Sequence, residues 1–185
     1  KSIMFAAQQI MLGQGDLIIA GGMESMSNIP FYLDKARWGY KFGEGKLIDG
    51  LQKDGLIDAY DKVAMGVSAD ATAEKYGISR EDQDRFAIQS YEISAAATAA
   101  GLFKDEIVPV SIPQRKGEPL IISEDEEFRK VKFEKIAELR AAFTKEGTAT
   151  AANSSTINDG ASALVIASEE AILKHGLIPI ARIVS

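Results

Sequence analysis

The sequence contains no cysteine and only one histidine, His175. Without cysteine, the 185 residues hold no disulfide framework, no thiolate zinc site and no cysteine nucleophile. His175 precedes Gly176 at the expected end of a helix, where the helix dipole favours a cationic side chain. We therefore interpret this histidine as structural.

Long apolar runs and an excess of basic residues are also lacking. No apolar stretch approaches the roughly 20 residues that span a bilayer, and no cationic leader precedes an apolar block. The net charge of -6 argues against bulk binding of nucleic acid, which needs a broad basic surface. The composition predicts a globular chain that binds neither nucleic acid nor membrane, although a local basic cluster can still hold a small anion.

The chain begins with an apolar helix and a strand. Ser2–Leu12 is apolar on nearly every side, which predicts a buried core helix that ends at Gly13 and Gly15. Leu17–Ala20 follows as a continuous apolar run that fits a strand buried on both faces. Because helix, short turn and buried strand make half of a parallel crossover, the pattern predicts an α/β fold.

The end of the chain is also predicted to combine strands with a helix. Ala161–Ala167 and Ile178–Val184 are predicted strands, and Ser168 between them is expected to cap a short helix that ends at His175. The first helix has no capping residue before it, and the last strand stops without a turn. Both edges lead us to expect a piece of a longer polypeptide.

The middle of the chain is predicted as an irregular aromatic stretch, two helices and a strand pair. These elements are a short helix near 47–51 within the irregular residues 28–62, helices over 66–76 and 79–101, and strands at 107–112 and 119–122. On the second helix, a stripe at helical spacing predicts the packed face: Phe86, Ser90, Ile93 and Ala97.

Three stretches are candidate sites. Thr148–Ser168 joins a run of small residues, an Asn-Asp-Gly turn and a short apolar strand, and its small residues let a ligand approach the main chain, although a tight structural connection is the alternative. Within it we expect Ala151–Ser155 to contact ligand and ion, and Asn158–Gly160 to be a structural turn. Gly21–Ser27 follows a strand and is either a site rim or a flexible turn. Arg129–Lys135 holds four cations after an acidic block, which suits a phosphate or simply a solvated face.

Three segments, in order along the chain, resemble motifs of the thiolase family. They are Ala20–Ser27 (AGGMESMS), Lys53–Leu56 (KDGL) and Asn153–Ala161 (NSSTINDGA). The match runs over the whole chain and is similar above all to the acetoacetyl-CoA thiolase branch, in its potassium-responsive mitochondrial type and its bacterial relatives. Asn158 before Asp-Gly resembles the short-chain biosynthetic enzymes, since the long-chain degradative ones tend to carry serine there.

The resemblance implies a thiolase-like α/β fold: the rear part of an N-terminal βαβ-layered domain with an inserted α+β loop domain. The implied division is 1–27 for the first piece of the N-terminal domain, 28–150 for the loop domain, and 151–185 for the return to the N-terminal domain and the start of the C-terminal domain. The family's reactive cysteines and histidine would lie outside this chain. We therefore expect no catalytic residue here, and no activity from the 185 residues alone.

The implied activity is the Claisen condensation of two acetyl-CoA to acetoacetyl-CoA, or the reverse thiolysis, through a cysteine acyl-enzyme. Two alternatives stay open: a thiolase for longer or branched 3-ketoacyl-CoA, and a non-catalytic thiolase-like protein that binds coenzyme A. The implied partners are acyl-CoA substrates and copies of the same chain in a dimer or tetramer. The implied location is the cytoplasm for a bacterial protein and the mitochondrion for a eukaryotic one.

The resemblance also implies the binding residues, position by position. For coenzyme A they are Leu56, Met65, Tyr91, Lys130, Val131, Lys132, Lys135 and Ser155. For a potassium ion they are Tyr91, Ala151, Ala152 and Ser154. Cations suit the phosphate of coenzyme A, and backbone carbonyls can replace the hydration shell of a monovalent ion.

The chain departs from the family pattern at three places. Ala64 stands where biosynthetic relatives often have histidine, which removes one polar contact to coenzyme A. Lys130 and Lys132 stand where relatives can have arginine and an acid, and lysine is a less directional phosphate partner than arginine. Ser154 stands where alanine is usual in the potassium site, a change that a backbone ligand would tolerate.

Overall fold

The structure is a computed structural model that describes residues 1–184. The chain divides into two compact units, which are described separately. The first unit joins Lys1–Phe31 to the segment from Ile157 to the C-terminal end, and the second unit is Tyr32–Thr156. The assignment of residues 1–27, 28–150 and 151–185 to thiolase domains stays a prediction. No helix within residues 1–184 has the length and apolar character needed to cross a bilayer.

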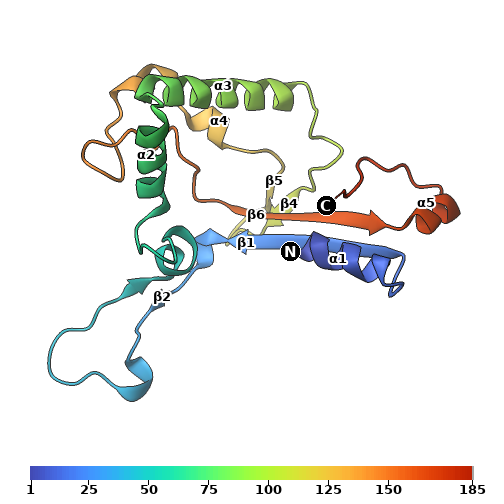
Figure 1. Ribbon diagram of the computed structural model, residues 1–185, viewed down its shortest axis with the longest axis horizontal. Helices are drawn as coiled ribbons and strands as arrows, with labels where there is room; N and C mark the ends of the chain where they lie inside the picture. Colours follow the sequence, from blue (N-terminus) through green and yellow to red (C-terminus); the bar gives the residue numbers. More distant parts are fainter. Residues whose placement is uncertain (185) are drawn as a thin grey trace. The chain divides into compact units, whose positions relative to one another are not determined.

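The first unit is built on a two-stranded antiparallel sheet. Strand β1 (Leu17–Ser25) pairs with β6 (Asp159–Ala167) in a register that runs from Leu17 opposite Ala167 to Ser25 opposite Asp159. Helix α1 (Ser2–Met11) lies along this pair, as Figure 1 shows. The parallel neighbour expected for β1 is not present in residues 1–184, where its partner is β6.

Burial in the first unit differs from the sequence prediction. Within α1 only Ala6 is buried, and Ile19 on β1 and Val165 on β6 are 77% and 62% exposed. The predicted all-round burial of this helix and these strands is therefore wrong for the described chain. The physical reason is that a two-stranded sheet with the short helices α1 and α5 (Glu169–His175) leaves much of the sheet surface and of α1 without a covering layer.

Three local predictions in the first unit have clear outcomes. Helix α5 (Glu169–His175) is confirmed, because the Ser168 hydroxyl accepts from the Ala171 amide at 3.1 Å and Gly176 ends the helix at φ 61°. The strand predicted over 178–184 is wrong, because this segment has no strand beside it within the described residues. The stretch Gly21–Ser27 is not a loop, because β1 continues to Ser25 and only then gives way to the 3₁₀ turn η1 (Met26–Asn28).

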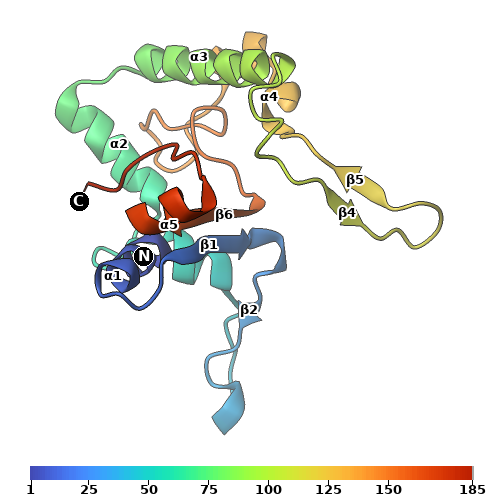
Figure 2. The same cartoon turned by 90° about the vertical axis from the view of Figure 1, so that its right-hand side faces the viewer.

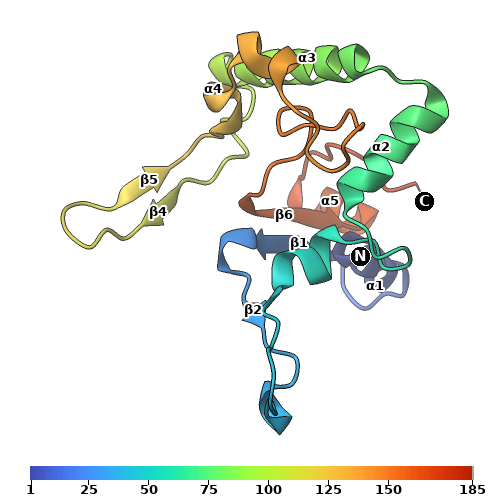
Figure 3. The same cartoon turned by 90° about the vertical axis from the view of Figure 1, so that its left-hand side faces the viewer.

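The second unit begins with short irregular elements. Strand β2 (Phe31–Tyr32) pairs with β3 (Ile48–Asp49), with the 3₁₀ turn η2 (Ala36–Trp38) between them. The short helix expected near 47–51 lies later, as the π-helical turn η3 (Gln52–Leu56). The predicted strand pair is confirmed as an antiparallel hairpin of β4 (Val110–Ile112) and β5 (Leu120–Ile122), which projects from the unit in Figures 2 and 3.

Helices form the frame of the second unit. The predicted helices are confirmed as α2 (Met65–Tyr76) and α3 (Arg80–Ala99), and the Ser79 hydroxyl caps α3 by accepting from the Asp82 amide. The predicted packed stripe on α3 is wrong, since Phe86 and Ile93 are 74% and 59% exposed. Asp84 and Ala87 are buried instead, because α3 turns a partly polar face towards the chain beneath it.

The core of the second unit lies between these helices and the chain that returns after them. Helix α4 (Glu127–Lys130) and the 3₁₀ turn η4 (Phe133–Glu138) contact α3. In Figure 3 the chain after η4 runs back beneath α3 and beside α2. The buried residues come from α2, α3, η4 and the chain after η4: Ala73, Ala87, Ile136, Ala149 and Thr150. The small-residue stretch predicted as a site is thus packed against two helices.

Candidate functional site

The loop formed by the small residues Thr148–Ser155 has no helix or strand, and α2 holds its first half. The carboxylate of Asp70 accepts hydrogen bonds from the Thr144 hydroxyl at 2.7 Å and from the amides of Thr148 and Ala149 at 2.9 and 2.8 Å. Burial alone would raise the pKa of Asp70, but these three hydrogen bonds outweigh burial and lower the pKa. The carboxylate is therefore a fixed anionic anchor for the loop.

Helix α3 holds the second half of this loop through Asn153. The Asn153 side-chain amide donates to the Asp84 carboxylate at 3.0 Å and to the Thr148 carbonyl at 3.1 Å. Its side-chain oxygen accepts from the Thr150 amide at 2.6 Å. Thr150 is fully buried, and its hydroxyl accepts from the Ala152 and Asn153 amides at 3.3 Å each. Side-chain hydrogen bonds thus fix the course of the backbone here.

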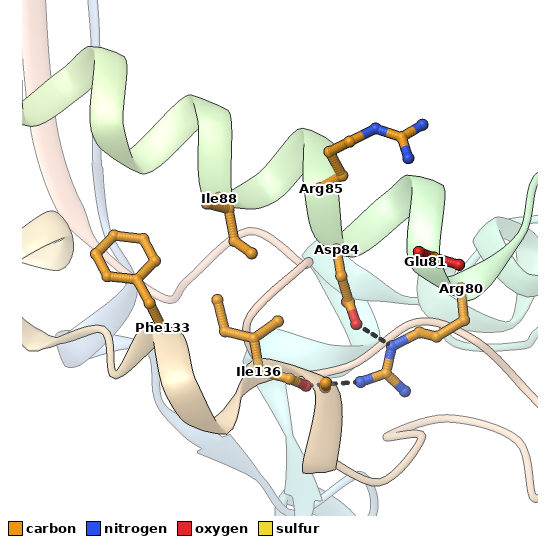
Figure 4. A pocket seen from close by; sticks show the side chains of 8 residues that line it. Arg80, Glu81, Asp84, Arg85, Ile88, Phe133 and Ile136 are labelled. Carbon is orange, nitrogen blue, oxygen red and sulfur yellow. Dashed lines mark hydrogen bonds and ion pairs between the residues drawn. The ribbon is translucent and has the colours of Figure 1, made fainter.

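Arg80 connects Asp84 to the turn η4. The Arg80 guanidinium donates to the Asp84 carboxylate at 2.7 Å and to the Ile136 carbonyl at 2.8 Å, as Figure 4 shows. Ile88, Phe133 and Ile136 lie beside this pair and line a shallow hollow of about 460 Å³. Four charged residues also line it, and two of them, Arg80 and Asp84, already bind each other.

The potassium prediction rests on residues that the structure brings partly together. The Tyr91 hydroxyl donates to the Ala152 carbonyl at 3.2 Å, and the Tyr91 ring meets Phe133 edge to face at 6.3 Å. Ser154 is half-buried and Ala151 is exposed on the same loop. An aromatic hydroxyl and a backbone carbonyl therefore meet at the place the resemblance indicates, and the ion itself stays a prediction.

The basic cluster lies on α4 and η4. Lys130 forms an ion pair with Glu126 at 2.5 Å, and Arg129 forms one with Glu124. The hydrogen bond and charge of Glu126 raise the pKa of Lys130. Lys132 and Lys135 are exposed, and no carboxylate of residues 1–184 lies within ion-pair distance of either. These two lysines are the cations that an incoming phosphate can reach without displacing an acid.

Two further predicted contacts lie next to each other at the start of α2. Leu56 ends η3 and Met65 begins α2, and an antiparallel bridge between Ile57 and Ala64 brings the two ends together. The Met65 side chain is 59% exposed, and Leu56 is half-buried. The remaining predicted residues also have clear places: Val131 is half-buried at the end of α4, and Ser155 is exposed.

Sequence reasoning missed the residues that shape the loop: Asp70, Arg80, Asp84 and Asn153. The sequence contained a signal for two of them, because Asp70 and Asp84 are acids that share a helix face with the small residues Ala73 and Ala87. Buried acids need partners, and loop amides are the usual donors. The donors that these acids bind lie some 70 residues further along the chain, so no local sequence pattern identifies them.

Comparison with known proteins agrees with the resemblance. Residues 1–170 match the family described as "Thiolase, N-terminal domain". The whole chain is 50% identical to "Acetyl-CoA acetyltransferase, mitochondrial" of Danio rerio, covering 44% of that protein. Over 98% of its length it is 46% identical to "Probable acetyl-CoA acyltransferase" of Staphylococcus aureus, covering 46% of that protein.

A solved structure extends the agreement to the fold. The chain superposes on the Acat5 thiolase of Ascaris suum, solved in complex with coenzyme A, with a TM-score of 0.90 and 42% identity. The match covers 100% of this chain and 46% of that one, so the chain spans about half the length of the relatives it matches. The predicted thiolase-like α/β fold is thereby confirmed. The chain belongs to the thiolase family, and its residues 1–170 correspond to the N-terminal domain of that family.

Proposed function

We propose that the protein containing this chain is an acetyl-CoA acetyltransferase, which condenses two acetyl-CoA to acetoacetyl-CoA or runs the reverse thiolysis. The observation that carries this proposal is 50% identity, over the whole chain, to an enzyme of that name. In this reaction a cysteine thiolate accepts an acetyl group from one acetyl-CoA and releases coenzyme A. The carbanion formed by deprotonation of a second acetyl-CoA then attacks the acyl-enzyme and frees the thiolate.

In this proposal, the role of this chain is to bind the coenzyme A portion of the acyl-CoA substrates. Lys132 and Lys135 offer exposed cations to a phosphate, with Lys130 beside them on α4. Ser155 offers an exposed hydroxyl, while Leu56, Met65 and Val131 offer apolar surface. Binding energy from the nucleotide end of the substrate is used to place the thioester at the reacting groups.

The test is cleavage of acetoacetyl-CoA by the purified full-length protein with and without free coenzyme A. We expect acetyl-CoA to form only when coenzyme A is present. Binding of coenzyme A without any turnover would contradict the proposal and favour the non-catalytic alternative.

A second candidate is a thiolase for longer or branched 3-ketoacyl-CoA. The 46% identity to a probable acetyl-CoA acyltransferase favours it, because that name leaves the acyl group open. A series of 3-ketoacyl-CoA substrates with increasing chain length separates the two functions. The acetyltransferase has its highest kcat/KM on acetoacetyl-CoA, whereas the alternative has its highest value on a longer chain.

A potassium ion fits the oxygen atoms of Tyr91 and Ala152, with Ala151 and Ser154 beside them on the loop. When bound, such an ion would supply positive charge and fix the backbone that faces coenzyme A. We expect potassium, but not sodium at the same concentration, to raise the Tm of the full-length protein, since an ion that binds the native state stabilises it. Equal Tm values in the two salts would contradict the potassium site.

The oligomeric state and the location of the protein are also proposals. We propose a homo-oligomer, a dimer or a tetramer, which light scattering of the full-length protein would measure. A mitochondrial location is proposed for a eukaryotic source and a cytoplasmic one for a bacterial source, because the relatives include a mitochondrial enzyme and bacterial ones.

A further inference from the structure

Two groups of the predicted coenzyme A contacts lie on separate segments of the chain. One group is on the small-residue loop and includes Ser155, and the other is on α4 and η4 and includes Lys132 and Lys135. Neither the loop nor the short turn η4 belongs to a sheet or a long helix that would fix its position. Both groups must nevertheless keep a constant separation if they are to bind one ligand.

A continuous chain of hydrogen bonds joins the two groups through α3. It runs from the Thr150 amide to Asn153, from Asn153 to Asp84, from Asp84 to Arg80, and from Arg80 to the Ile136 carbonyl next to Lys135. The distances along it are 2.6, 3.0, 2.7 and 2.8 Å. Figure 4 shows the part of this chain that crosses from α3 to η4.

The groups in this chain of hydrogen bonds are buried or half-buried, so water cannot easily take the place of a lost partner. Asp84 is 8% exposed, Ile136 is 2% exposed and Thr150 is fully buried. A buried carboxylate that loses a hydrogen-bond donor keeps the cost of its desolvation. Breaking the bond between Asn153 and Asp84 is therefore unfavourable, and removing the Asn153 donor should make the loop shift its position. Asn153 fits this role because one side chain both donates to Asp84 and accepts from the loop backbone.

We propose that Asn153 and Asp84 are positioning residues, which hold Ser155 and the two lysines at η4, Lys132 before it and Lys135 within it, at the separation that coenzyme A requires. This inference rests on the proposed function. Neither residue is assigned a contact with substrate, so both act through the backbone they hold. Their loss is expected to weaken binding of coenzyme A while the reacting groups stay intact.

The key variant is Asn153→Asp in the full-length protein. It keeps the size of the side chain but replaces the donor that faces Asp84 with a second carboxylate oxygen. We expect the KM for coenzyme A to rise about tenfold, with kcat changed less than about twofold, since the lost interaction belongs to binding. The matched control is Gln89→Glu, which makes the same amide-to-acid change at an exposed position of α3 and should leave KM unchanged.

A swapped double variant separates positioning from general damage. In Asp84→Asn with Asn153→Asp, the donor lies on α3 and the acceptor on the loop, so the hydrogen bond between them can form in reverse. We expect this double variant to recover part of the KM lost in Asn153→Asp. A purely structural role predicts that two buried changes damage the protein more than one.

The outcomes distinguish this inference from the proposed function. A wild-type protein without thiolysis contradicts the proposed function. An active wild type whose Asn153→Asp variant keeps its KM, or loses only kcat, overturns the inference alone. If circular dichroism shows that Asn153→Asp does not fold, Asn153→Ala is measured by the same criteria. Failure of both variants to fold overturns the inference in favour of a structural role.

Discussion

The anchor at Asp70 gives a prediction whose size follows from the structure. Asp70→Ala removes the acceptor of hydrogen bonds from Thr144, Thr148 and Ala149. The Thr144 hydroxyl can rotate to another partner, but the two amides point into the space that the carboxylate leaves. Ala149 is only 5% exposed, so water reaches its amide poorly.

The expected loss is the cost of two orphaned amides. Each unsatisfied buried donor costs about 1–3 kcal/mol, so we expect Asp70→Ala to lower the free energy of unfolding by about 3 kcal/mol. Asp70→Asn keeps one oxygen for the amides and loses the charge, for which we expect about 1 kcal/mol. Removing the carboxylate also removes the cost of its desolvation. The value of about 3 kcal/mol for Asp70→Ala therefore lies in the lower half of the range for two unsatisfied amides.

Low pH should reduce the contribution of the Asp70 carboxylate to the free energy of unfolding. Because hydrogen bonds outweigh burial and lower the pKa of Asp70, its contribution is fully present above the unfolded pKa of about 4. It is lost as the pH falls through the lower folded pKa. The stability difference between wild type and Asp70→Asn is therefore constant at neutral pH and shrinks under strongly acidic conditions.

The assay is urea unfolding followed by circular dichroism at neutral and acidic pH. The control is Asp105→Ala, an exposed acid for which we expect a change of less than about 0.5 kcal/mol. An Asp70→Ala variant no less stable than Asp105→Ala would refute the reasoning. A change in the m-value would show that the variant alters the surface exposed on unfolding as well as the stability.

Two further predictions concern a glycine of β1 and an acid beside the basic cluster. Gly21→Ala places a Cβ 2.6 Å from the Ser162 carbonyl oxygen across the β1–β6 pair, so we expect a loss of about 2 kcal/mol in urea unfolding. Its neighbour Gly22 has open space at that position, so Gly22→Ala should cost little, and equal losses would argue against the close approach. Glu126→Gln frees Lys130 from its ion pair and should lower the KM for coenzyme A about two- to threefold, because exposed pairs are weak. Glu124→Gln frees Arg129 instead, and the account fails if it lowers KM as much.

Local signals predicted the longer helices and the hairpin of this fold, but not the strand expected over 178–184. The Ser79 and Ser168 caps and the glycine that ends α5 are set by neighbouring residues, so sequence spacing is enough to find them. The hairpin of β4 and β5 follows from two short apolar runs around a turn. The resemblance to thiolases rests on motifs of the same local kind, and the family assignment followed from it.

Local sequence patterns could not predict which side chains are buried or which strands pair over a long sequence distance. The stripe through Phe86 was expected to pack, yet α3 buries Asp84 because Arg80 and Asn153 satisfy its carboxylate. The antiparallel pairing of β1 with β6 joins strands more than 130 residues apart. Apolar runs such as Leu17–Ala20 predict a strand, but they cannot show which segments of the chain cover its faces.

The most direct test of the central claim, that this chain binds coenzyme A for a thiolase reaction, is the double variant Lys130→Ala, Lys135→Ala in the full-length protein. Thiolysis of acetoacetyl-CoA is measured at varied coenzyme A concentration. The account predicts that KM for coenzyme A rises more than kcat falls, because the proposal places the lysines at the nucleotide end of coenzyme A and not at its reacting thiol. A fall in kcat at unchanged KM would contradict it.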